Sequence, residues 1–244
     1  MRANYKMQRL FVEGTLARGA TLPLTKNQTN YLLNVLRMDD GNTLLVFNGR
    51  DGEWRATVDK TGKKTAQLLC TDIERAQTAA SGLVFCFAPL KAGRLDYLVQ
   101  KAVEMGAGTL IPVLTDYTQN HRLSAAKIEA WAIEAAEQCG VLSIPHCSDP
   151  VKLDRLLADW DEARTLIFCD EDSETNNPVA HLTPLKGRSL GVLVGPEGGF
   201  SKAERETLKS LDHVAPIPLG PRILRADTAA VAALAVVQAL AGDW

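Results

Sequence analysis

The second part of the chain alternates regularly between short apolar runs and amphipathic segments, and this constrains the fold most strongly. Apolar runs of five or six residues are typical of strands covered on both faces. The segments between them carry apolar residues at helical spacing. Repeated strand–helix units predict an α/β fold with a mainly parallel sheet flanked by helices. The predicted strands are 83–87, 109–114, 165–169, 190–194 and 214–219, and the predicted helices are 93–105, 124–139, a short one from Ser201, and about 228–240.

The first 75 residues have a different rhythm. The apolar run 43–47, the turn cluster 48–52 and the alternating segment 53–58 predict a hairpin, and 65–71 predicts another strand. Residues 26–38 predict one helix, with Tyr31, Leu32, Val35 and Leu36 on one stripe. We therefore expect a small β-barrel-like domain over 1–75, a linker at 76–82 and an α/β domain over 83–244.

Charge is distributed unevenly along the chain. Residues 1–70 hold eleven lysines and arginines against six acids, a net charge of +5, and the remainder carries −7. This asymmetry favours a polyanionic partner for the first domain, although solvated lysines are a simpler alternative.

Two further observations concern location and metals. No apolar run approaches the roughly 20 residues that span a bilayer, and the charged amino terminus lacks a secretory core, so we expect a cytoplasmic protein without membrane contact. The five cysteines and four histidines show no metal-ligand spacing, which predicts reduced thiols and no metal site.

The first of two loops that can carry chemistry is Val-Gly-Pro-Glu-Gly-Gly-Phe-Ser at 194–201. Its glycines allow positive φ and close approach of a ligand to the backbone. Ser201 and Glu204 match a capping box, and free amides at a helix start can bind an anion. No Lys-Ser/Thr pair follows the glycines, which disfavours a nucleoside-triphosphate site. A purely structural tight turn is the alternative.

The second loop is Leu-Gly-Pro-Arg-Ile-Leu-Arg-Ala-Asp-Thr-Ala at 219–229. It follows a predicted strand, and open α/β sheets bind ligands at the carboxyl ends of their strands. Arg222 and Arg225 flank an apolar pair that suits a flat base, while an arginine can hold phosphate or a developing negative oxygen. Alternatively, both arginines are surface ion-pair partners. The final helix is apolar around nearly its whole circumference, so it packs either within its own domain or in a subunit interface.

These loops make the chain recognisable. GPEGGFS and LGPRILRADTA resemble the signatures of bacterial small-subunit ribosomal RNA uridine-N3 methyltransferases. Four more segments are similar to that family in the same order, so the resemblance covers both halves of the chain. They are Arg9–Phe11, Val35–Met38, Val99–Gly106 and Ile133–Gly140.

The resemblance implies a SPOUT methyltransferase domain with a trefoil-knotted sheet, preceded by a PUA-like domain that binds RNA. It implies S-adenosyl-L-methionine as cofactor, a homodimer, and small-subunit ribosomal RNA or the assembled small subunit as partner. It also implies RNA contacts at Arg9 and Arg37. The implied cofactor pocket contains Gly195, Glu197, Gly198, Gly199, Leu219, Gly220, Ile223, Leu224 and Thr228, of which Leu219, Gly220, Ile223 and Leu224 would enclose the adenine.

Arg225 and Thr228 would lie where the cofactor meets the target base. We expect Arg225 to stabilise negative charge on the uracil oxygens and Asp227 to act as a base. Asp227 stands where the family usually has a longer Glu, which puts this second role in doubt. Val141 stands where Arg is common, which would remove one RNA contact.

Two functions of other classes compete with the methyltransferase. One is a non-catalytic RNA-binding or ribosome-assembly protein on the same fold. In such a protein we would expect the sequences of the loops at 194–201 and 219–229 to depart from those of the methyltransferases. The other is a metabolic nucleotide-binding enzyme, which the missing lysine and the basic first domain disfavour.

Overall fold

The computed structural model describes residues 6–91, 93–170 and 177–244. Its contacts divide the chain into two compact units. The first holds the chain up to Ala79 together with Ala136–Ile144, and the second holds Ala80–Ala135 and Pro145–Trp244. The segment 136–144 therefore packs with the first unit, although the sequence analysis placed it in the second domain.

The first unit is built on a five-stranded sheet in the order β1-β3-β4-β5-β2. Strand β1 is parallel to β3, and the other neighbours are antiparallel. The hairpin predicted around 48–52 is confirmed, with Thr43 opposite Thr57 and Phe47 opposite Glu53. One face of the sheet packs on a core that includes Leu32, Leu44 and Leu68. The strands are β1 (Arg9–Phe11), β2 (Thr21–Pro23), β3 (Thr43–Phe47), β4 (Glu53–Gly62) and β5 (Thr65–Arg75).

The helix predicted over 26–38 is irregular. It consists of α1 (Lys26–Asn30) and a turn of π-helix, η1 (Tyr31–Val35), in which the amide of Leu36 donates to the carbonyl of Tyr31 five residues earlier. The wider turn rotates the stripe of apolar residues. Val35, expected on the buried stripe, is therefore 62% exposed.

A buried ion-pair triad joins β1, β4 and β5 of the first unit. The carboxylate of Glu53 is fully buried, and its oxygens lie 2.6 Å from Nε of Arg9 and 2.6 Å from Nε of Arg75. Burial alone would raise the pKa of Glu53, but the hydrogen bonds from Arg75 and Arg9 outweigh it and hold the pKa below its ordinary value.

The same two arginines close the end of α3 (Ala125–Cys139). Arg9 donates to the carbonyls of Ala136, Glu137 (3.0 Å) and Val141 (3.0 Å), and Arg75 donates to that of Gly140 (2.9 Å). The last carbonyls of a helix lack partners within it and attract cations, so these contacts stabilise the helix end. Two segments that resemble the family, Arg9–Phe11 and Ile133–Gly140, thus meet in one structural feature.

The second unit is a fully parallel sheet in the order β12-β10-β11-β6-β7-β8, with β9 pairing with β7. This confirms the predicted α/β class. The strands are β6 (Val84–Phe87), β7 (Thr109–Leu114), β8 (His146–Cys147), β9 (Val151–Lys152), β10 (Thr165–Cys169), β11 (Leu190–Val194) and β12 (Val214–Ile217).

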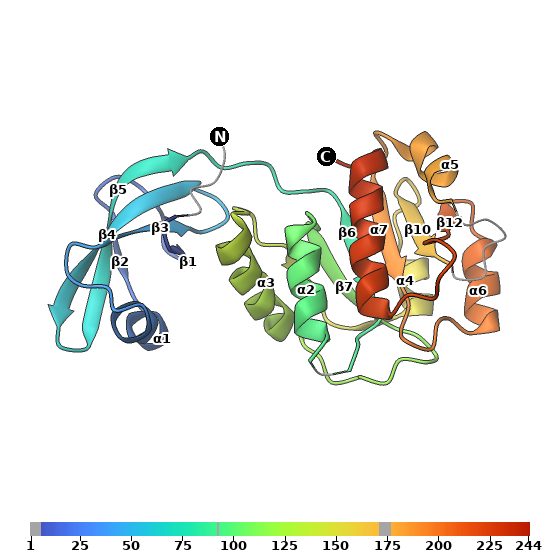
Figure 1. Ribbon diagram of the computed structural model, residues 1–244, viewed down its shortest axis with the longest axis horizontal. Helices are drawn as coiled ribbons and strands as arrows, with labels where there is room; N and C mark the ends of the chain where they lie inside the picture. Colours follow the sequence, from blue (N-terminus) through green and yellow to red (C-terminus); the bar gives the residue numbers. More distant parts are fainter. Residues whose placement is uncertain (1–5, 92, 171–176) are drawn as a thin grey trace. The chain divides into compact units, whose positions relative to one another are not determined.

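Helices cover both faces of this sheet. The helices α2 and α7 run side by side (Figure 1), while residues of α4 and α6 join Phe168 and Leu193 in a core cluster on the sheet. The strands are buried on both sides, which explains their continuous apolar runs. The helices are α2 (Leu95–Glu104), α4 (Leu153–Ala158), α5 (Val179–Leu182), the 3₁₀ turn η2 (Thr183–Leu185), α6 (Lys202–Lys209) and α7 (Ala226–Ala241).

None of the described helices combines the length with the apolar character that crossing a membrane requires.

Candidate active site

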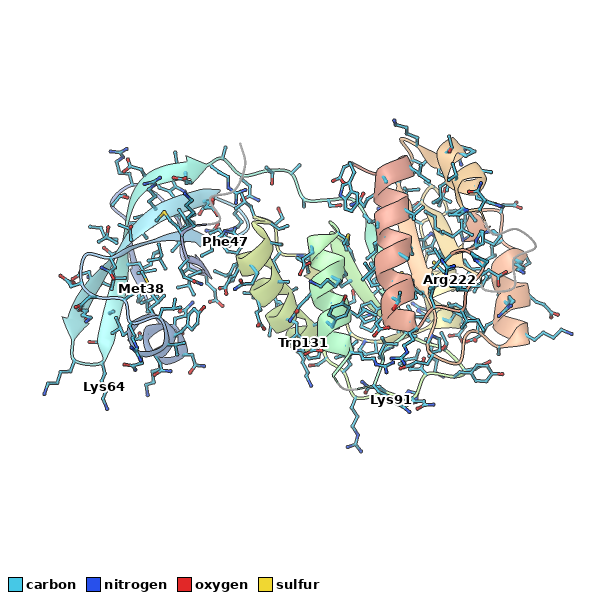
Figure 2. The ribbon with its side chains drawn as sticks, viewed as in Figure 1. Met38, Phe47, Lys64, Lys91, Trp131 and Arg222 are labelled. Carbon is cyan, nitrogen blue, oxygen red and sulfur yellow. The ribbon has the colours of Figure 1, made fainter. Side chains whose placement is uncertain are left out.

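Asp170, directly after β10, and the loops after β11 and β12 lie at one edge of the sheet, because these three strands are parallel neighbours. The two loops singled out in the sequence, 194–201 and 219–229, contribute to the same cleft. Figure 2 marks Arg222 in the second of these loops. The cleft is lined by Cys169, Asp170, Val194, Gly195, Pro196, Glu197, Gly199, Phe200, Arg205, Pro218, Leu219, Gly220, Pro221, Arg222, Ile223, Leu224, Ala226 and Ala229.

Most of the expected pocket residues line this cleft, namely Gly195, Glu197, Gly199, Leu219, Gly220, Ile223 and Leu224. The other expected residues are not among the described cleft-lining ones: Gly198, Arg225, Asp227 and Thr228. Each of these four residues is adjacent in the sequence to a lining residue, so they flank the cleft.

The glycine-rich loop is anchored beneath the cleft by Phe200. This ring packs edge-on against Phe168 of β10, with 5.0 Å between centroids. A Cβ atom at Gly195 would stand 2.7 Å from the Phe200 ring, so only glycine lets the loop lie this close.

The start of α6 fixes the other end of this loop. The predicted capping box is confirmed: the amide of Ser201 donates to the Glu204 carboxylate (2.8 Å), and the amide of Glu204 donates to Oγ of Ser201 (3.3 Å).

A buried carboxylate lies at the end of β10, at a position that the sequence analysis missed. Asp170 is 2% exposed and forms ion pairs with Arg205 (3.2 Å) and Lys209 (2.6 Å), both on α6. Asp170 and Arg205 also line the cleft. The signal that could have revealed Asp170 was its position directly after a predicted buried strand, where ligand-binding residues concentrate.

The loop after β12 presents exposed side chains to solvent. Ile223 is 91% exposed, Arg222 is exposed, and Arg225 is exposed at the N-cap of α7. Within the described parts of the chain, neither arginine forms an ion pair or a side-chain hydrogen bond, so the ion-pair alternative finds no support there. Asp227 lies 3.9 Å from Nε of Arg94, which precedes α2.

Comparison with known proteins places this geometry in a family. Residues 77–238 match the model of an RNA methyltransferase domain, and residues 24–69 match that of an RNA methyltransferase PUA domain. Ribosomal RNA small subunit methyltransferase E of Synechocystis is 33% identical over 91% of this chain and 74% of its own length. The chain belongs to the ribosomal RNA small subunit methyltransferase E family.

Two solved structures that are similar to this chain contain S-adenosyl methionine. The Neisseria gonorrhoeae enzyme, bound to S-adenosyl methionine, is 25% identical with a TM-score of 0.83, covering 98% of this chain and 99% of its own. A Legionella pneumophila structure with bound SAM is 30% identical with a TM-score of 0.85 and the same coverage. The Rickettsia conorii methyltransferase E is 28% identical over 96% of each chain.

One expectation drawn from the methyltransferase E resemblance needs correction. Arg9 was expected to contact RNA. Its side chain is only 3% exposed, however, and it forms an ion pair with Glu53 and hydrogen bonds with carbonyls at the end of α3. A phosphate cannot reach this guanidinium without breaking the triad. We therefore assign Arg9 a structural role; Arg37, which is exposed, is unaffected by this argument.

Proposed function

We propose that this chain transfers a methyl group from S-adenosyl-L-methionine to N3 of a uridine in small-subunit ribosomal RNA. The observation that carries the proposal is the meeting of residues 195–199 and 219–224 in one cleft, in a chain of the methyltransferase E family. The non-catalytic alternative would leave such loops free to degenerate, whereas both are intact.

The lining of the cleft suits this cofactor. Leu219 and Leu224 offer apolar surface to a flat adenine, while Asp170 and Glu197 bring carboxylates and Arg205 a guanidinium to the polar part of a nucleoside with an amino-acid tail. When bound, S-adenosylmethionine supplies a methyl group activated by a sulfonium centre.

Arg225 and Asp227, which flank the cleft, would act on the target uracil. Uracil N3 carries a proton, and its anion is the better nucleophile, so negative charge must be stabilised on the uracil oxygens as the proton leaves. Arg225 can hold that charge, because its guanidinium is exposed beside the cleft. Asp227 can accept the proton, with Arg94 helping to orient its carboxylate. The uridine must leave its stack to reach them.

The PUA-like first unit would bind RNA, and Arg37 is a candidate contact. Arg37 is exposed and has a φ of 55°. This backbone conformation is unfavourable for most residues other than Gly and Asn. We expect Arg37→Gly to stabilise the protein by about 0.5–1 kcal/mol in chemical denaturation, because the strain is relieved. RNA affinity should fall at the same time, and Arg37→Asn should also lose affinity. Unchanged RNA binding in both variants would remove Arg37 from the interface.

The assembly would follow the family. We propose a trefoil knot, supported by the position of β12 beyond β10 and the return of the following loop to the cleft. An experimental structure in which the backbone is unknotted would contradict it.

We also propose a homodimer through α7, which leaves Val231 and Val236 half-buried in one chain. Light scattering at the mass of one 26.5 kDa chain would contradict the dimer.

The enzymatic proposal is tested by incubating the purified protein with S-adenosylmethionine labelled in its methyl group. Naked small-subunit RNA and assembled small subunits, both from cells lacking the enzyme, would be separate substrates. We expect 3-methyluridine in nucleoside mass spectrometry with at least one of them, as fits an enzyme acting in the cytoplasm, where these subunits reside. Cofactor binding without methylation of either substrate would favour the non-catalytic alternative.

A further inference from the structure

Tyr117 is an exposed aromatic residue on a fixed backbone. It lies in the loop that follows β7, and its side chain is 51% exposed. Thr115 and Thr118 are buried on either side of it: the amide of Thr115 donates to Oγ1 of Thr118 (2.9 Å), and the two hydroxyls are 2.9 Å apart. Further along, Nδ2 of Asn120 donates to the carbonyl of Leu90 (3.0 Å).

The neighbouring Asp116 ties this loop to the start of α6. Its amide donates to Oε1 of Glu204 (2.8 Å), and its Oδ2 accepts from Oγ of Ser201 (2.6 Å). Ser201 and Glu204 are the capping box that terminates the glycine-rich loop. Through these hydrogen bonds, the backbone next to Tyr117 keeps a fixed position relative to the glycine-rich loop that lines the cleft.

Tyr117 also lies next to Gly198 of that loop. A Cβ atom at Gly198 would lie 3.4 Å from Cβ of Tyr117 and 3.7 Å from its Cγ and Cδ2. Gly198 is an expected pocket residue that does not line the described cleft, whereas its neighbours Glu197 and Gly199 do. Tyr117 therefore lies beside the glycine-rich loop, next to a residue whose two neighbours line the cleft.

We propose that Tyr117 is a stacking platform for an unpaired nucleotide of the RNA adjacent to the methylated uridine. The inference rests on the proposed function and adds to it a residue that positions the substrate. Extruding a uridine leaves neighbouring bases unstacked, and a rigid exposed ring compensates for the stacking they lose. The exposed His121 and Arg122, a few residues along the same loop, suit the accompanying phosphates.

The test compares Tyr117→Phe, Tyr117→Leu and Tyr117→Ala. Phenylalanine keeps the ring, leucine keeps apolar bulk without a ring, and Tyr97→Ala serves as a control because Tyr97 is also exposed (44%) but lies on α2. We expect Tyr117→Phe and Tyr97→Ala to keep wild-type kcat/KM for RNA. Tyr117→Leu and Tyr117→Ala should lose about 10- to 100-fold, mainly through KM, at unchanged cofactor affinity in calorimetry.

A direct readout separates this inference from the enzymatic proposal. Binding of a uridine-rich oligonucleotide containing 2-aminopurine is followed by fluorescence, with quenching expected for wild type and Tyr117→Phe but not for Tyr117→Leu. Failure of the wild-type protein to methylate RNA would defeat the enzymatic proposal, whereas this readout would still report stacking. Equal kcat/KM and equal quenching in Tyr117→Leu and wild type would overturn the role of Tyr117. A loss of cofactor affinity matching the loss of kcat/KM would also overturn it, because the residue would then support the cofactor loop.

Discussion

Replacing Arg225 by alanine is expected to lower kcat for RNA methylation by about 10²–10³-fold, the effect of removing one donor from a developing oxyanion. Arg225 precedes the first residue of α7, its side chain is exposed, and it flanks the cleft. It forms no ion pair with any described residue, so its removal should cost little folding stability. Cofactor affinity, measured by calorimetry, should stay within about twofold, because a role confined to the transition state leaves ground-state binding intact.

Matched variants separate charge from geometry at this rim. Arg225→Lys keeps the charge without the planar fork and should recover only part of the activity. Asp227→Asn should lower activity with a changed pH profile if this carboxylate accepts the N3 proton. Arg155→Ala is the control, because Arg155 is 69% exposed and pairs only with Asp159 among the described residues. Full activity of Arg225→Ala would remove this residue from the mechanism.

Glu53→Gln is expected to destabilise the protein by about 3–5 kcal/mol in urea denaturation, because breaking a buried pair leaves an uncompensated charge. Arg9 would keep its cation at 3% exposure, without the carboxylate that neutralises it. The end of α3 depends on the same guanidinium, so the change should also loosen residues 136–144. Hydrogen exchange at these amides would report that loosening.

Glu74→Gln provides the control for this substitution. Glu74 pairs with Arg55 at 2.7 Å, but the arginine is 47% exposed. The same loss of charge should therefore cost less than about 1 kcal/mol. Equal destabilisation by the two variants would contradict the importance of burial.

The sign of the pH dependence follows from the depressed pKa of Glu53. Its stabilising contribution is present above the ordinary carboxyl value of 4.5 and is lost as the pH falls through the lower folded-state value. Wild-type stability should therefore decline in acid more steeply than that of Glu53→Gln.

The sequence predicted the parallel sheet well, because its strands are covered on both faces and leave continuous apolar runs. Strand β7 was predicted residue for residue at Thr109–Leu114. The two loops were also recognised, since glycines and a capping box mark the chain locally. The helix at 26–38 was only partly right, because the i→i+5 bond of Leu36 to Tyr31 changes its periodicity without a clear signal in composition.

Long-range pairing was the part that sequence reasoning could not supply. Arg9 was expected to contact RNA, and only the fold brings it to Glu53 and to carbonyls 127 to 132 residues further along the chain. Tyr117 was overlooked for the same reason, because its significance depends on Asp116 meeting the start of α6. A residue type alone does not reveal whether its partner lies nearby in space.

A crystal structure of the protein grown with S-adenosylmethionine tests the central claim most directly. We predict electron density for the cofactor between residues 195–199 and 219–224, with its methyl group directed toward the side where Arg225 lies. Density at another site, or a cleft that stays empty at saturating cofactor, would contradict the account.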